Sequence, residues 1–215
     1  MNVVPSSARD RARQYAQDAS GVAAVEFSLI LPVALLMMAL VVYGGQAFRI
    51  QRKVELSAAT VANLVAQGGN TGAATVSSAE MTQILAYPNL ILYPNNVSAI
   101  QVVVSELKIS SVSGVVTGTV VGSWPNANAT ARPCNQQLPL NANIVAAFTG
   151  ASESSSYNNN NVGYVILGEI VYPFSPSDIY VSVGLLTLHS SILMIPRTNT
   201  EVNVLNSSGS TTLCP

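Results

Sequence analysis

The hydrophobic pattern of the chain begins with a long uncharged stretch near the N-terminus. Residues 27–48 read FSLILPVALLMMALVVYGGQAF and contain no charged side chain. Together with Val22–Val25, the stretch provides the roughly 20 apolar residues that a membrane-spanning helix needs. A soluble helix that is apolar on every side would need a much larger protein around it. The pattern therefore predicts a single membrane-spanning helix, and the absence of a small-x-small cleavage site after it argues against a secretory signal peptide.

After the uncharged stretch, the apolar residues continue at steps of three and four. Gly68-Gly69 then follows, a pair that is typical of a helix end. We therefore expect one helix over residues 22–67, about 69 Å long at 1.5 Å per residue. Its first half would lie in lipid and its second half would pack on its own domain, with a break at Gly44-Gly45 as the alternative. The apolar stripe of the second half consists of Ala47, Ile50, Val54, Ala58, Val61 and Val65.

The rest of the chain changes to a period of two with many β-branched residues, which predicts strands. Residues 68–79 are expected to form a loop, and Ser77 with Glu80 forms a possible capping box for a short helix through Leu85 that stops near Pro88. Residues 125–161 are predicted to be irregular, with Asn158–Asn161 in a solvated loop. The fold class is therefore α+β, a long helix on a small antiparallel sheet. The expected strands are 97–109, 115–124, 162–172, 186–195 and 201–205.

Charge is scarce and unevenly distributed. Only 9% of the residues are charged, against about 25% in an ordinary soluble domain. Residues 1–68 carry six basic and four acidic side chains, whereas residues 69–215 carry three basic and six acidic ones. Basic side chains are therefore not in excess, which argues against a nucleic-acid-binding protein. The distribution of charge suits a weakly basic membrane anchor followed by a mildly acidic domain.

Orientation in the membrane does not follow from the basic residues, because three precede the span and three follow it closely. The chain has two cysteines, Cys134 and Cys214, both after the span. In an exported domain such a pair predicts one disulfide, whereas two buried thiols are the alternative for a cytosolic domain. The cysteine pair and the Ser/Asn-rich composition favour an N-terminus inside the cell and a C-terminal domain outside it.

The junction between the polar leader and the apolar helix carries a specific spacing. Gly21 is followed by Val22, and Glu26 stands five residues after the glycine, next to Phe27. This order resembles the processing site of type IV prepilins and pseudopilins. The resemblance implies that a prepilin peptidase removes a cytoplasmic leader, residues 1–21, between Gly21 and Val22. It also implies a long helix over 22–67 and an exported domain over 68–215, in a pilin-like fold.

The wider run of residues 21–67 resembles the TadE family of pseudopilins, from tight-adherence (Tad, Flp) pilus systems. Toward the C-terminus, residues 172–174 (Tyr-Pro-Phe) and 195–197 (Ile-Pro-Arg) resemble that family's late Y-P-F and R-P-R elements, with an isoleucine replacing the first arginine. Phe27 stands where the small major pilins of these systems usually have tyrosine. That difference and the long C-terminal domain argue against the major filament subunit and favour a minor pilin or pseudopilin.

Cleavage would give Val22 a free α-amino group, which is mostly cationic at neutral pH. In a bundle of staggered parallel helices this amine can meet Glu26 of a neighbouring chain. In a low-dielectric setting the pair is much stronger than in water, although desolvation offsets much of the gain. The expected role of Glu26 is therefore to set the register of assembly. The alternative is that Glu26 has no role in assembly and lies at a shallow depth, at the level of the lipid headgroups.

No catalytic constellation is expected. His189, Asp178 and Ser190 or Ser191 could be written as a triad, but no G-x-S-x-G elbow is present and the remaining carboxylates stand singly. Neither a cofactor nor a metal site is predicted. The expected partners are other pilins, the inner-membrane Tad assembly platform and prepilin peptidase.

The expected function is thus a non-enzymatic protein of pilus biogenesis, surface adhesion and biofilm growth. It would reside in the bacterial inner membrane as a single-pass protein, with its N-terminus in the cytoplasm and its C-terminal domain in the periplasm, or in the extracellular pilus. The main alternative is an uncleaved, signal-anchored periplasmic binding module. A cell-wall or carbohydrate hydrolase on a membrane stalk is a remote third candidate.

Overall fold

The computed structural model describes residues 19–68, 75–112, 115–140, 163–174, 186–197 and 202–205. The chain divides into two compact units, Met1–Gln46 and Ala47–Pro215, and we call the second the C-terminal domain. The first helix, α2 (Ala19–Ala66), belongs to both units. It runs without interruption through Gly44 and Gly45, so the alternative of a break there is wrong. The helix also continues through Pro32.

The C-terminal domain contains an antiparallel sheet with the strand order β4-β3-β2-β5-β6. A separate parallel pair joins β1 (Thr75–Ser77) to β7 (Asn203–Leu205). The long helix and this sheet confirm the expected α+β class. The strands of the sheet are β2 (Gln101–Val112), β3 (Val115–Pro125), β4 (Gln137–Pro139), β5 (Gly163–Phe174) and β6 (Leu186–Met194).

The second half of α2 packs on the sheet through the predicted apolar stripe. Five of its six members, from Ile50 to Val65, are buried, and Ala47 packs against the same core. The opposing strands contribute alternate residues such as Val102, Val104 and Ile170, as expected where one face of a sheet is covered. At Gly168 on β5, an added Cβ would lie 2.9 Å from both the Ala58 carbonyl oxygen and the Ala62 Cβ. The absence of a side chain at Gly168 therefore sets the distance between helix and sheet.

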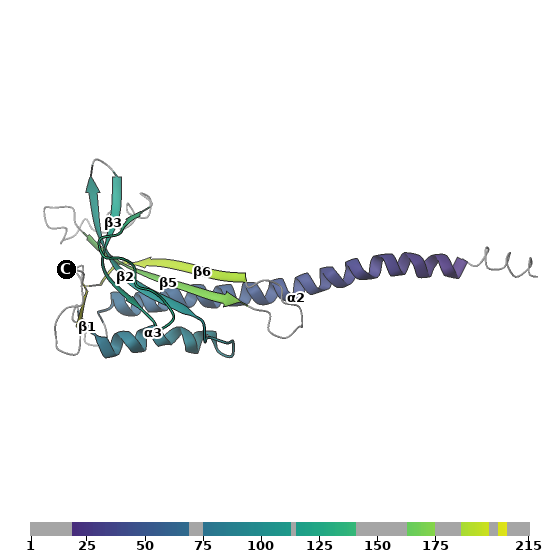
Figure 1. Cartoon of the computed structure of the whole chain (residues 1–215), viewed down its shortest axis with the longest axis horizontal. Helices are drawn as coiled ribbons and strands as arrows, with labels where there is room; N and C mark the ends of the chain where they lie inside the picture. Colours follow the sequence, from purple (N-terminus) through teal and green to yellow (C-terminus); the bar gives the residue numbers. More distant parts are fainter. Residues whose placement is uncertain are drawn as a thin grey trace, which may run out of the picture. The chain divides into compact units, whose positions relative to one another are not determined.

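The second helix, α3 (Ser78–Leu92), lies on the same side of the sheet as this part of α2 (Figure 1). Its N-terminus confirms the capping box, because the Ser77 hydroxyl accepts the Glu80 N–H and the Glu80 carboxylate accepts the Ser77 N–H. The expected stop near Pro88 is wrong. Pro88 lies inside the helix and is buried, and the helix continues to Leu92. Burial in the core offsets the loss of one backbone donor at the proline.

The predicted strands are found with shifted ends, and two short strands were missed. The first predicted strand, β2, begins at Gln101 instead of Val97. Strand β1 lies in the expected loop over 68–79, and β4 lies in the segment that was expected to be irregular. Both missed strands have three residues, too few to show a period of two. The Asn158–Asn161 run lies outside the described residues.

A buried carboxylate connects the sheet to the parallel pair. Glu106 on β2 is fully buried among the apolar residues of the core side. Its Oε1 accepts the backbone N–H of Val202 at 2.7 Å, immediately before β7. Burial of a carboxylate is costly unless its oxygens are satisfied, so the contact fixes the position of the C-terminal segment. At the other end of the β2–β5 pairing, the Tyr172 hydroxyl donates to the Asn96 carbonyl at 2.9 Å. Burial raises the pKa of this phenol, which keeps the proton in place.

Candidate functional site

The expected processing and assembly residues lie at the start of α2. Gly21, Val22, Glu26 and Phe27 are all exposed. Val22 and Glu26 are four residues apart in an α-helix, so they lie on the same face, one turn from each other. The side chains around them are apolar and equally exposed, including Val25 at 62% and Phe27 at 64%. The glutamate therefore stands in an apolar surface that no other part of the described chain covers.

Gly21 is not required by the packing of the residues that the structure describes. An added Cβ at Gly21 would find no atom within 4 Å. Gly168 is the opposite case, because a Cβ there would collide with α2. A glycine with open space around it is consistent with close approach by another molecule.

The apolar half of α2 has the length and composition of a membrane span. The candidate span begins at Gly21, and none of the residues in its most apolar part is buried. Large side chains such as Leu29, Val41 and Leu36 are more than three-fifths exposed. An apolar surface this extensive marks a contact with lipid or protein. The segment is thus compatible with a membrane anchor.

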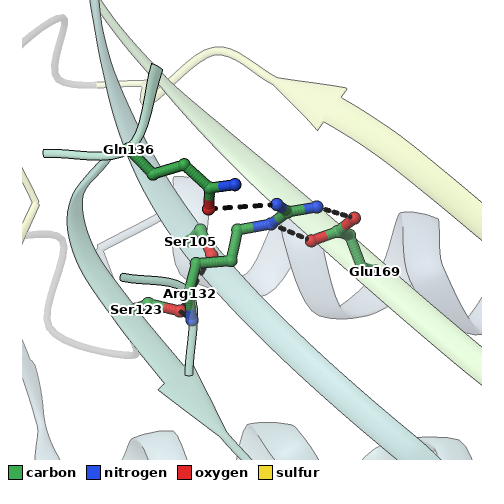
Figure 2. Close-up of polar contacts among 5 residues, drawn as sticks. All are labelled: Ser105, Ser123, Arg132, Gln136 and Glu169. Carbon is green, nitrogen blue, oxygen red and sulfur yellow. Dashed lines mark hydrogen bonds and ion pairs between the residues drawn. The ribbon is translucent and has the colours of Figure 1, made fainter. Parts of the chain in front are cut away.

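A second polar site lies in the C-terminal domain, on the sheet face away from α2. Arg132 follows β3 and reaches across β2 to Glu169 on β5 (Figure 2). Its Nε donates to Glu169 Oε2 and its Nη2 to Oε1, both at 2.6 Å, which is the bidentate geometry. Nη1 donates to Gln136 Oε1 at 3.4 Å. The hydrogen bonds to Glu169 raise the pKa of Arg132, against the opposing effect of burial.

The backbone of Arg132 is held as well as its side chain. Its N–H donates to the Ser123 hydroxyl at 2.9 Å, and Ser123 hydrogen-bonds the buried Ser105 at 3.0 Å. The side chains of Arg132 and Glu169 are only 26% and 13% exposed. The pair therefore fastens the segment after β3 onto the sheet.

We expect the Arg132–Glu169 pair to stabilise the domain. Arg132→Leu should lower the free energy of unfolding by about 2 kcal/mol, because it leaves a mostly buried carboxylate without its donors. The double variant Arg132→Leu/Glu169→Leu should lose less than the sum of the two single variants. Urea unfolding, followed by the fluorescence of the single tryptophan, Trp124, measures these differences.

A matched control is Arg197→Leu, at an exposed arginine of the same domain, with an expected change within about 0.5 kcal/mol. Additive losses in the double variant would contradict a coupled pair.

Comparison with known proteins gives one match. Residues 21–63 match the family model described as TadE-like protein. This segment is TadE-like. The match confirms the resemblance drawn from the sequence, and it begins at Gly21, next to the expected cleavage position. No curated protein and no solved structure matches the chain.

The TadE-like segment indicates a protein associated with Tad pilus systems. It covers the apolar half of α2 and most of the half that packs on the sheet. The late elements at 172–174 and 195–197 lie outside the matched residues. Within the domain, Tyr172 and Phe174 are buried in the main core, so their own packing accounts for these two positions.

The other residues singled out from the sequence are not brought together in the described chain. His189 is exposed on β6, whereas the neighbouring Ser190 is buried on the opposite face. Asp178 lies outside the described residues. Among the residues described, no three His, Cys, Asp or Glu side chains are grouped as metal ligands would be. Cys134 lies between β3 and β4, and Cys214 lies outside the described residues, so their pairing stays a prediction.

Sequence reasoning missed the Arg132–Glu169 pair. The two residues lie in different segments, and no local spacing connects them. A signal was nevertheless present in the composition, since charges are scarce in this domain. Glu169 interrupts an otherwise apolar strand, and Arg132 is one of three basic residues after residue 68. A mostly buried carboxylate needs hydrogen-bond donors, and an arginine is one of the few strong side-chain donors in a domain this poor in charge.

Proposed function

We propose that this chain is a non-enzymatic minor pilin or pseudopilin of a Tad-type pilus machine. The observation that carries the proposal is the TadE-like segment, whose match starts at Gly21 and includes an exposed Glu26 in an apolar helix. Prepilin peptidase would cut between Gly21 and Val22. The processed subunit would then join or prime a filament that supports pilus biogenesis, surface adhesion and biofilm growth.

The exposure of the bond supports cleavage there. Gly21 and Val22 are both exposed, and an added Cβ at Gly21 would find no atom within 4 Å, so another molecule can approach the backbone at this point. Removal of the leader leaves the new amine on the same face as Glu26.

Assembly would follow because the charge of Glu26 is unfavourable in its apolar surroundings. A lone carboxylate in an apolar helix is costly in lipid, and a cation from a neighbouring chain offsets that cost. The uncut chain lacks this cation, so assembly would become possible only after cleavage. The partners are other pilins, the inner-membrane assembly platform and the peptidase. The proposed topology is a single span in the bacterial inner membrane, with the leader in the cytoplasm and the C-terminal domain in the periplasm or the pilus.

The first test is the N-terminus of the protein extracted from membranes. Sequencing or intact mass should show a chain that starts at Val22. Gly21→Val should block cleavage, because a β-branched side chain stands where the peptidase must approach the backbone. Gly45→Val is the matched control, since Gly45 is a helix glycine with the same open surroundings and should leave cleavage intact.

Mature protein that retains Met1 would overturn the proposal. That result would favour an uncleaved, signal-anchored periplasmic binding module, in which Glu26 is a shallow interfacial residue.

A further inference from the structure

A pocket of about 290 Å³ lies beside the Arg132–Glu169 pair. Its floor comes from Val103 on β2 and Val171 on β5, and Gln101, Thr130 and His189 stand around it. Val103 and Val171 alternate along their strands with residues that face α2, so the pocket opens on the other face of the sheet. No part of the proposed function uses this face.

The walls of the pocket are held by hydrogen bonds to the backbone of the sheet. Asn126 exchanges hydrogen bonds with Val102 and donates its side-chain amide to the Ile100 carbonyl at 2.9 Å. Asn128 donates to the Ser98 carbonyl at 2.8 Å and to Ile100 at 3.1 Å. Asn126, Asn128 and Arg132 all belong to the segment that follows β3, and the Arg132–Glu169 pair holds its other end (Figure 2). The pocket is therefore formed before any ligand arrives, as ligand pockets usually are.

The chemistry of the lining selects against charged ligands. Arg132 and Glu169 compensate each other, and the guanidinium already donates to Glu169 and Gln136, so an anion would have to compete with both. An amide, a hydroxyl and an imidazole offer both donors and acceptors at the rim. The two valines offer an apolar floor. A ligand that fits this lining is uncharged, carries many hydroxyl groups and has one apolar face.

We propose that this pocket binds a neutral saccharide. A sugar ring presents hydroxyl groups around its edge, for the rim, and C–H groups on its face, for the valine floor. The volume of about 290 Å³ is just below the range of roughly 300–1,000 Å³ that is usual for ligand pockets, which suits one or two rings. The inference does not depend on cleavage or filament assembly, because the site lies wholly within the C-terminal domain.

The test is a titration of the full chain in phospholipid nanodiscs, which avoids detergents with sugar headgroups. The probes are the methyl glycosides of glucose, galactose and N-acetylglucosamine, with sodium sulfate as the anion control. Saturation-transfer NMR and calorimetry measure binding. At least one glycoside should bind at millimolar concentration, and sulfate should not bind.

Variants place the binding in this pocket. Gln101→Ala should weaken the glycoside about threefold to tenfold, as expected for one lost hydrogen bond. Gln137→Ala, at an exposed glutamine on β4, is the matched control and should leave affinity unchanged. Thr130→Trp should fill the pocket and remove binding, with an unchanged unfolding transition as evidence that the domain is folded.

The proposal would be overturned if no glycoside bound. It would equally be overturned if binding survived Thr130→Trp, or if sulfate bound at the same site. None of these results would bear on the N-terminus at Val22, so the failure of this inference and the failure of the proposed function are distinguishable.

Discussion

Gly168→Ala is expected to lower the free energy of unfolding of the C-terminal domain by about 3 kcal/mol, the upper end for one added core methyl group. The new Cβ would lie 2.9 Å from the Ala58 carbonyl oxygen and the Ala62 Cβ, and 3.4 Å from the Ala62 backbone nitrogen. Two of these atoms are helix backbone, which cannot turn aside as a flexible side chain can. The helix must move away from the sheet, and the packing of the buried stripe on β5 is disturbed with it. Urea unfolding followed by Trp124 fluorescence measures the loss.

Gly118→Ala is the matched control within the same sheet. Its Cβ would meet the ends of two leucine side chains, Leu140 at 3.0 Å and Leu107 at 3.3 Å. These ends can change rotamer, so the expected loss is below about 1 kcal/mol. Equal losses for the two variants would contradict the view that Gly168 sets the separation of helix and sheet.

Glu26→Ala is expected to leave cleavage after Gly21 largely intact and to abolish incorporation into pili. A cationic amine left without its carboxylate inside an apolar bundle costs about 3–5 kcal/mol, which lowers the association constant by about 100-fold or more. Glu26→Gln should behave in the same way, because it keeps the shape and removes the charge. Immunoblots of sheared pili and of membranes, with N-terminal sequencing of the membrane form, separate assembly from processing.

The matched control for this experiment is Glu55→Ala. Glu55 is an exposed glutamate farther along α2, in the half that packs on the sheet, and it accepts a hydrogen bond from Gln51 at 3.2 Å. Its loss should leave piliation unchanged. Normal piliation with Glu26→Ala would refute the pairing role, even if the mature chain begins at Val22.

The helical part of the fold was predictable because its physics is local. The stripe from Ile50 to Val65 repeats at the period of a helix, and the same residues are buried against the sheet. The capping box at Ser77 and Glu80 also depends on four consecutive residues. Pro88 shows the limit of local reasoning. The residue has a helix-breaking preference, yet its burial in the core lets α3 continue to Leu92.

The candidate sites also differ in whether they depend on neighbouring residues or on residues far apart in the sequence. The Gly21–Glu26 spacing is readable because it lies within two turns of one helix. The contacts of Glu106 with Val202 and of Arg132 with Glu169 cannot be predicted in this way, because only the folded sheet brings these residues together. Scarcity of charge shows that such residues need partners, but only the topology identifies them.

The pairing of β1 with β7 sets the order in which a nascent chain can finish folding. Residues 75–77 leave the ribosome well before residues 203–205, the strand that pairs with them. Until that segment arrives, the buried carboxylate of Glu106 lacks the Val202 N–H, and one edge of the core stays open. Residues through 205 must therefore be made before the domain can close, and a product truncated before them would expose this open edge of the core to quality-control proteases.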